Sequence, residues 1–195
     1  MSPKENLVRH YRWLRQYGYN DSHSGNASIK DEDTVWVTPS GACADTLETG
    51  ELIACGLDGA IGKRASLDAP LHVRVYQLNS ATAAVLHSHG AHTIAMTLDG
   101  SDFEPVDFEG QLYFPNVPVI TIPFEDYVSK SPQAVAECLA AHPITVVRGH
   151  GVYACGESLN LAYKWTCSLE LSAKIAFIAQ RAGTVSGLPS SRKTR

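Results

Sequence analysis

The sequence predicts a single α/β domain, and three observations support this. The chain has 195 residues, of which 44% are hydrophobic and 18% charged, which suffices for one well-buried core but is short for two. Short apolar runs bounded by polar residues recur along the chain, as is typical of buried strands. Segments with apolar residues at helical spacing lie between them. We expect this domain to span residues 1–183 and residues 184–195 to form a disordered tail, because they are rich in Ser, Gly and basic side chains.

The first half of the chain begins with an amphipathic segment. Apolar residues at helical spacing before Gly18 predict a helix over residues 5–17. The elements that follow are expected in this order: a loop at 22–28, a strand at 34–38, a sharp turn at 39–41, a short helix and a hairpin within 47–64, a helix that opens at Asp68, and a strand at 83–86.

The second half is expected to alternate helices with apolar strands. In order, we expect a helix at 91–98, a polar loop at 102–117, a strand at 118–123, a helix at 131–140, a strand that ends at His150 and a long helix at 159–182. Ser131 and Ser158 suit the starts of the last two helices, Pro132 suits a first helical position, and Gly183 suits a helix end. The long helix should bury a stripe made of Leu159, Ala162, Tyr163, Thr166, Leu169, Ala173, Ala176 and Phe177.

Two histidines, one residue apart, follow the strand at 83–86. Because strand side chains alternate between faces, His87 and His89 should point to the same side. Neutral imidazole is a common ligand of zinc and similar divalent ions, and a catalytic site needs about three protein ligands and one open position. His150, which lies between two glycines at the end of another apolar run, and Asp68 can complete this set.

An isolated pair of this kind is more often two ordinary strand histidines. Two strands that end in histidine, each followed by a small residue, are harder to explain by packing. His92 is a weaker candidate ligand, because a helical residue three positions beyond a chelating strand usually points elsewhere. His72, one turn after Asp68 on the same helical face, is expected in the core or behind the ligands.

Two turns contain small residues that suit an anion. In the loop at 22–28, backbone amides can approach an anion and the Asn26 amide can donate to a phosphate oxygen. The turn at 39–41 presents a hydroxyl and a free amide at its tip. A plain Gly/Asn turn is the alternative for the first of these loops.

Five motifs occur in the order and spacing of the class II aldolase/adducin superfamily, which the chain resembles from about residue 5 to residue 182. They are Ser24-Gly25-Asn26-Ala27-Ser28, Val37-Thr38-Pro39-Ser40-Gly41, Ser66-Leu67-Asp68, His87-Ser88-His89 and His150-Gly151. The resemblance implies a three-layer α/β/α fold with a mixed, largely antiparallel central sheet. It also implies a site whose residues are His87, His89 and His150 for a divalent metal, and Gly25, Asn26, Ser40, Gly41 and Ser66 for a phosphate. Zinc suits the imidazole ligands best, with Mn2+, Co2+ and Fe2+ as the alternatives.

The chain departs from the aldolase pattern of this superfamily at Leu67 and Asp68. That pattern has two serines that hold phosphate, followed by a glutamate that acts as acid and base beside the metal. Leu67 removes one phosphate donor, and Asp68 is expected to move the proton, to join the metal shell as in the epimerase branch, or to cap the following helix. In the family, the loop equivalent to 102–117 serves a neighbouring subunit of a four-fold ring, so Glu109 or Tyr113 should supply a catalytic acid or base there; a solvated carboxylate and a half-buried aromatic are the alternative. The tail has no tyrosine for the usual proton donor.

We therefore expect a divalent-metal-dependent aldolase that cleaves a phosphorylated ketose through a metal-stabilised enolate, assembled as a homotetramer. A sugar-phosphate 4-epimerase, a methylthioribulose-1-phosphate-type dehydratase and a metal-free, adducin-like interaction module are the alternatives, and the histidines argue against the last. The net charge of −4 argues against nucleic acid or a membrane surface as the main partner. The chain has no run of about 18 apolar residues, no signal-like N-terminal region, and five cysteines without CxxC spacing, which together predict a soluble protein of the reducing cytoplasm.

Overall fold

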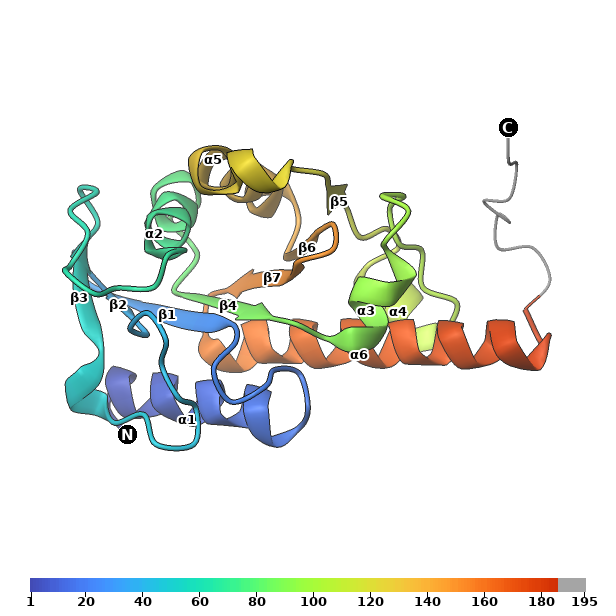
Figure 1. Ribbon diagram of the computed structural model, residues 1–195, viewed down its shortest axis with the longest axis horizontal. Coiled ribbons are helices and arrows are strands. Elements are labelled where there is room, and N and C mark those ends of the chain that lie inside the picture. The colour runs from blue at the N-terminus through green and yellow to red at the C-terminus, as the bar shows by residue number, and fades with distance from the viewer. Residues whose placement is uncertain (186–195) are drawn as a thin grey trace.

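A seven-stranded sheet forms the centre of the computed structural model, which describes residues 1–185 (Figure 1). The strands run in the order β3, β2, β1, β4, β7, β6, β5, and every neighbouring pair is antiparallel except β5 and β6, which are parallel. They are β1 (Asn26–Asp31), β2 (Thr34–Val37), β3 (Ile53–Gly56), β4 (Ala84–Ser88), β5 (Val119–Ile120), β6 (Ile144–Val147) and β7 (Gly151–Gly156). This confirms the expected mixed, largely antiparallel sheet. Most of the expected tail, residues 186–195, lies outside the described residues.

Helices cover both faces of the sheet and form the expected three layers (Figure 1). The helices are α1 (Pro3–Gln16), α2 (Ala69–Leu78), α3 (Ala91–Met96), α4 (Phe108–Tyr113), α5 (Tyr127–Ala141) and α6 (Leu159–Ala182), with short 3-10 helices η1 (Thr49–Glu51) and η2 (Phe124–Asp126). On one face α2 packs against α5, while α1 and α6 lie on the other, with α3 and α4 against α6. Within residues 1–185, no helix has the length and apolar character needed to span a membrane.

Local sequence signals account for the limits of the first and last helices. Ser2 and Glu5 form a capping box at the start of α1, in which each side chain accepts a hydrogen bond from the other residue's backbone amide. The Ser158 hydroxyl accepts from the Leu161 amide at 3.1 Å and so caps α6. Gly183 then ends α6 in the left-handed conformation, with φ +68°. Both helices therefore lie where the sequence predicted them.

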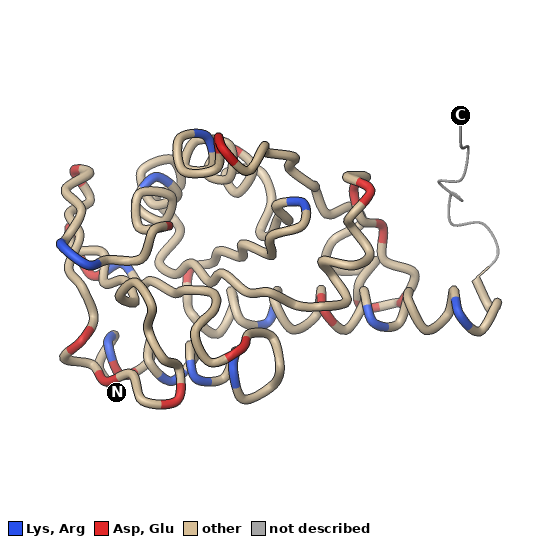
Figure 2. The backbone as a smooth tube through the Cα atoms, viewed as in Figure 1, with Lys and Arg blue, Asp and Glu red and all other residues tan. Residues whose placement is uncertain are grey.

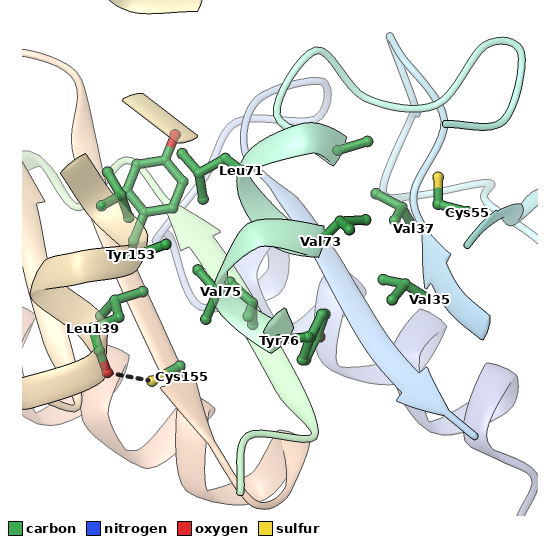
Figure 3. Packing of buried hydrophobic residues seen from close by; sticks show 14 of the residues in the cluster. Val35, Val37, Cys55, Leu71, Val73, Val75, Tyr76, Leu139, Tyr153 and Cys155 are labelled. Atoms are coloured by element: carbon green, nitrogen blue, oxygen red, sulfur yellow. Dashed lines mark hydrogen bonds between the residues drawn. The ribbon is translucent and has the colours of Figure 1, made fainter. Parts of the chain in front are cut away.

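Alternation along β4 assigns neighbouring side chains to opposite layers. Val85 belongs to the apolar cluster beneath α2 and α5, whereas Leu86 belongs to the cluster that faces α1. Figure 3 shows the first cluster, in which Leu71 of α2 and Tyr153 of β7 are among the largest fully buried side chains. The same alternation puts His87, two residues after Val85, on the α2 and α5 face. This placement determines which groups the histidine can meet.

Two of the predicted connections are different in the structure. The loop expected at 22–28 ends early, because Asn26–Asp31 form β1, whose polar residues are held between β2 and β4 by pairing on both sides. The hairpin expected within 47–64 is not made by strands on either side of Asp58-Gly59. Instead β3 pairs with the preceding β2, and the Asp58-Gly59 turn leads back towards α2.

The expected helix at 131–140 begins one turn earlier, at Tyr127, so Pro132 lies inside α5. Proline cannot donate to the carbonyl four residues before it, which belongs to Val128, an exposed residue that water can reach. Packing of α5 on α2 stabilises the earlier turn. The shift matters for the site, because it brings the Tyr127 side chain into the protein.

The strand expected to end at His150 is also shorter than predicted. β6 ends at Val147, His150 lies in the turn that follows, and β7, which the sequence analysis missed, begins at Gly151. The polar loop expected at 102–117 contains the short helix α4, capped by the Asp107 side chain. In the long helix, Phe177 is 42% exposed rather than buried, because the C-terminal part of α6 runs past the end of the sheet (Figure 1).

The core on the α2 and α5 face should be sensitive to loss of volume. Leu71→Ala, at a fully buried position, should lower the free energy of unfolding by about 2–5 kcal/mol, because a cavity replaces the side chain. Leu67→Ala, four residues earlier and 62% exposed, is the matched control and should change it by less than about 0.5 kcal/mol. Urea denaturation monitored by circular dichroism measures both. Equal losses in the two variants would contradict the assigned packing.

Candidate metal centre

Three histidines meet where β4 ends and where β6 turns into β7. Pairing of β4 with β7 places His87 opposite Tyr153 and so brings it near the turn that carries His150. The Nε2 atom of His87 lies 2.9 Å from that of His89 and 3.2 Å from that of His150. Their ligand atoms all lie within 4.8 Å of one another. The structure therefore brings together all three residues that the sequence analysis named as metal ligands.

The hydrogen bonds of His87 select the tautomer that a metal requires. Its Nδ1 lies 2.9 Å from the backbone carbonyl of Val152, so Nδ1 carries the proton and Nε2 presents a lone pair to the cluster. The ring stacks on Tyr153, with centroids 4.0 Å apart. Burial lowers the pKa of His87 well below its ordinary value, against the opposing effect of Asp68. Burial also lowers the pKa of His89 and His150, so the neutral, metal-binding form is favoured in all three.

At two positions of this site, other atoms lie so close to the backbone that only glycine fits. A Cβ atom on Gly151 would lie 2.8 Å from the His89 ring and 2.9 Å from the His87 ring. Gly25 has φ +67°, and a Cβ there would lie 2.5 Å from the carbonyl oxygen of His87. The two glycines thus allow neighbouring chain segments to pack directly against the histidines.

Asp68 occupies the N-cap position of α2, but its carboxylate makes no capping hydrogen bond. It is 5% exposed and accepts hydrogen bonds of 2.8 Å from the side chains of Asn26, Tyr127 and Tyr153. Burial alone would raise its pKa, but His87 and the Asn26 and Tyr127 hydrogen bonds outweigh burial and lower the pKa to about 2. Asp68 Oδ2 lies 3.9 Å from His87 Nε2, so an ionised carboxylate stands beside the histidine cluster.

Tyr127 and Tyr153 are site residues that the sequence analysis missed. Their hydroxyl groups contact each other as well as Asp68, and the Tyr127 ring lies 4.6 Å from that of His150. Burial, followed by the charge of Asp68, raises the pKa of both, so they remain hydrogen-bond donors at neutral pH. Tyr153 is fully buried and Tyr127 only half-buried. Had the strand that begins at Gly151 been predicted, the alternation of its side chains would have put Tyr153 on the same face of the sheet as Gly151. Nothing in the sequence near Tyr127 indicates its role.

The proposed phosphate segments adjoin one another beside this carboxylate. The Ser66 amide donates to Thr38, and the Ser40 amide donates to Arg64, which ties the turn at 39–41 to the segment before α2. The Ser40 amide is therefore already used, and Asn26 donates to Asp68. Ser40 and Gly41 are exposed to solvent. The segments that carry Ser40 and Ser66 are thus hydrogen-bonded to each other, and Asn26 lies next to the histidines because it pairs with His87.

The structure separates the other candidates from the histidine cluster. Glu109 is exposed on α4, and the Tyr113 ring packs against Trp165 of α6, with centroids 5.7 Å apart. Neither belongs to the histidine cluster of its own chain. His92 instead bonds Glu170 through Nδ1 at 2.8 Å. His72 is fully buried and bonds the Ser28 hydroxyl at 2.6 Å, as expected for a core position.

Charges of the two signs are unevenly distributed along the described chain (Figure 2). Residues 75–129 include seven Asp and Glu and no Lys or Arg, whereas α1 carries four basic residues and one acidic residue. The fold and the site together therefore define a three-layer α/β/α protein with three neutral histidines and a carboxylate at the edge of a mixed sheet.

Comparison with known proteins identifies the family. Residues 5–177 match the model of the class II aldolase and adducin N-terminal domain. The chain belongs to this family, whose name describes lyase-type enzymes together with adducin.

Relatives within the family have different names. The chain is 33% identical over 162 residues to methylthioribulose-1-phosphate dehydratase of Acidiphilium cryptum, covering 75% of this chain and 76% of the relative. It is 29% identical to 3-oxo-tetronate 4-phosphate decarboxylase of Escherichia coli, covering 91% and 87%. The crystal structure of L-fuculose-1-phosphate aldolase from Thermus thermophilus superposes with a TM-score of 0.86 at 28% identity, covering 95% and 97%.

Acid should destabilise the metal-free protein partly through Asp68. Its pKa in the folded protein, about 2, lies below the ordinary value of 3.8, so its contribution is fully present above about pH 4 and is lost as the pH falls through 2. Between pH 5 and pH 2, the wild type should lose about 2 kcal/mol more unfolding free energy than Asp68→Asn. Urea titrations at several pH values measure this. Parallel pH profiles for the two proteins would contradict the assigned environment of the carboxylate.

Proposed function

We propose that this protein is a divalent-metal-dependent aldolase that cleaves a phosphorylated ketose through an enolate. The observation that carries the proposal is the convergence of three imidazole Nε2 atoms, with the His87 tautomer held by Val152. Three neutral histidines fit zinc, or Mn2+, Co2+ or Fe2+, and leave a position open for substrate. When bound, such an ion supplies positive charge that stabilises the negative charge developing on the substrate oxygens as the carbon–carbon bond breaks.

Proton transfer is assigned to Asp68 and Tyr127. In aldol cleavage, a hydroxyl proton of the substrate must leave, and a proton must later reach the enolate carbon. The ionised Asp68 carboxylate can take up a proton, and the half-buried Tyr127 hydroxyl, which bonds Asp68 Oδ1, can pass one between substrate and carboxylate. Tyr153 holds the other carboxylate oxygen and so orients Asp68. Tyr127 would then act as the proton donor, a role for which other family members use a tyrosine of the C-terminal tail.

The substrate's phosphate is assigned to the edge formed by Gly25, Asn26, Ser40, Gly41 and Ser66. The open hydroxyl of Ser40 and the exposed backbone at Gly41 support this assignment. Two of the expected donors, the Ser40 and Asn26 amides, already bond the protein, and Leu67 replaces a serine. Phosphate binding should therefore be modest.

We further propose a cytoplasmic homotetramer in which Glu109 or Tyr113 completes the neighbouring chain's site. The exposure of Glu109, together with the large exposed side chains Phe108 and Leu112 on the same short helix, supports an interface at α4. Since neither candidate lies in the histidine cluster of its own chain, a role in catalysis requires a second subunit.

A dehydratase is the second candidate function. It is favoured by the 33% identity to methylthioribulose-1-phosphate dehydratase, whereas Asp68 in place of the aldolase glutamate follows the pattern of the epimerase branch. Loss of a β-hydroxyl uses the same stabilised charge beside a carbonyl as aldol cleavage. A 4-epimerase shares these groups as well. A metal-free, adducin-like module would not need three histidines at this spacing.

Removing one histidine should abolish tight metal binding. Purified protein should hold about one zinc ion per chain, and His150→Ala should weaken zinc affinity by about 100-fold or more, because only two ligands remain. His142→Ala, at the end of α5 and outside the cluster, is the matched control and should retain the metal. Competition with a chromophoric chelator measures affinity. Full zinc affinity in His150→Ala would exclude that residue from the metal shell.

Turnover should depend on both the metal and the substrate's phosphate. The zinc-loaded protein should release triose phosphate from one of a panel of ketose 1- and 5-phosphates, and the corresponding free sugar should react at least about 100-fold more slowly, because remote phosphate contacts orient the reacting carbons. A coupled assay detects triose phosphate, and mass spectrometry detects loss of water. Dehydrated product without triose phosphate would replace the aldolase with the dehydratase, and equal turnover of the free sugar would contradict the phosphate assignment.

A further inference from the structure

We propose that Glu170 of α6 is a positioning residue that holds His89 in place for the metal. This inference rests on the proposed metal-dependent function. Glu170 is remote in sequence from the histidine pair, and within the described residues its hydrogen bonds go to His92 and Thr93 and not to the three imidazoles of the cluster. It acts on the backbone immediately after His89.

The Glu170 carboxylate accepts four hydrogen bonds from the first turn of α3. Oε1 accepts from the His92 amide at 3.0 Å and from His92 Nδ1 at 2.8 Å. Oε2 accepts from the Thr93 amide at 2.9 Å and from the Thr93 hydroxyl at 2.8 Å. The N-cap residue of α3 is Gly90, which offers no side chain of its own to satisfy these amides. Glu170 therefore serves as the cap from a different helix.

The chain next to His89 is shaped around this carboxylate. A Cβ atom on Gly90 would lie 2.3 Å from Glu170 Oε2, so the residue after His89 has to be small for the carboxylate to approach. On the other side, the His89 amide donates to the Asn20 side chain at 2.8 Å and to the Tyr19 carbonyl at 2.9 Å. His89 lies beyond the last residue of β4, so pairing within the sheet does not hold it. Hydrogen bonds hold its backbone instead. Asn20 binds the His89 amide, and Glu170 binds the amides of the residues that follow Gly90.

The carboxylate matters for this role because each of its oxygens accepts from a backbone amide, which can only donate. Glutamine has the same shape, but its NH2 group cannot accept a hydrogen bond. In Glu170→Gln, the amide of His92 or of Thr93 would therefore face another donor, whichever way the side chain is turned, and the Glu170 side chain is only 12% exposed, so water has little access to replace the lost bond. The first turn of α3, and with it His89, should then lose its fixed position.

The test is a double-mutant cycle read out as zinc affinity. Glu170→Gln should weaken zinc binding by about 10- to 100-fold, the range typical of groups that orient metal ligands. In a His89→Ala background the same substitution should change affinity by less than about threefold, because the ligand through which Glu170 acts is gone. Glu104→Gln, an exposed glutamate, is the matched control and should leave affinity unchanged. Chelator competition measures zinc, and urea denaturation of the metal-free proteins measures stability.

Each outcome decides a different question. Unchanged zinc affinity in Glu170→Gln would overturn the positioning role, as would an equal loss of affinity with and without His89, which would show that Glu170 acts on the fold as a whole. Absence of zinc binding by the wild type would instead contradict the proposed function.

If Glu170→Gln does not fold, a second variant tests the same role. Thr93→Val removes one of the four bonds without adding a donor. It should weaken zinc binding about fivefold when His89 is present and leave it unchanged in the His89→Ala background.

Discussion

Antiparallel pairing of β4 with its two neighbours is the constraint on which the site depends. β1 places Asn26 opposite His87 on one side, and β7 places Tyr153 opposite His87 on the other. Because a shift of one residue would turn every side chain of β4 to the other face, the burial of Val85 and Leu86 in opposite layers sets this register. His87, Tyr153 and Asn26, which donates to the Asp68 carboxylate, therefore meet as a consequence of core packing.

Asp68 connects that register to the helices above the sheet. Burial of a carboxylate is unfavourable unless hydrogen bonds stabilise its charge, and here they come from β1, α5 and β7. One ionised group thus joins two strands and two helices, since Asp68 itself begins α2. Removing it would leave Asn26, Tyr127 and Tyr153 without their shared acceptor. The same arrangement fixes the carboxylate beside the histidines before any substrate arrives, which is the form of preorganisation that acid–base chemistry requires.

Membership of the family does not by itself choose the reaction. The relatives are named as an aldolase, a dehydratase and a decarboxylase, and the aldolase structure shares its fold with this chain. Around the histidines of this chain lie an aspartate, two tyrosines that share it, and a leucine beside the aspartate. Leu67 is largely exposed beside Asp68, so the rim of the site is less polar than two serines would make it. The choice of substrate is therefore expected to depend on these positions.

The sequence by itself determined the helix limits marked by Ser158 and Gly183, the same-side placement of His87 and His89, and the family, because caps, strand alternation and motif spacing are local properties. It did not show β7, whose six residues follow too closely on a turn to be separated from β6 by composition. Nor did it show the early start of α5, since Pro132 is a stronger local signal than the packing on α2 that overrides it. Only the tertiary structure placed Tyr127 and Tyr153 against Asp68, and Glu170 against the first turn of α3. Their roles arise from contacts between segments about 60 to 85 residues apart, and no local pattern encodes such contacts.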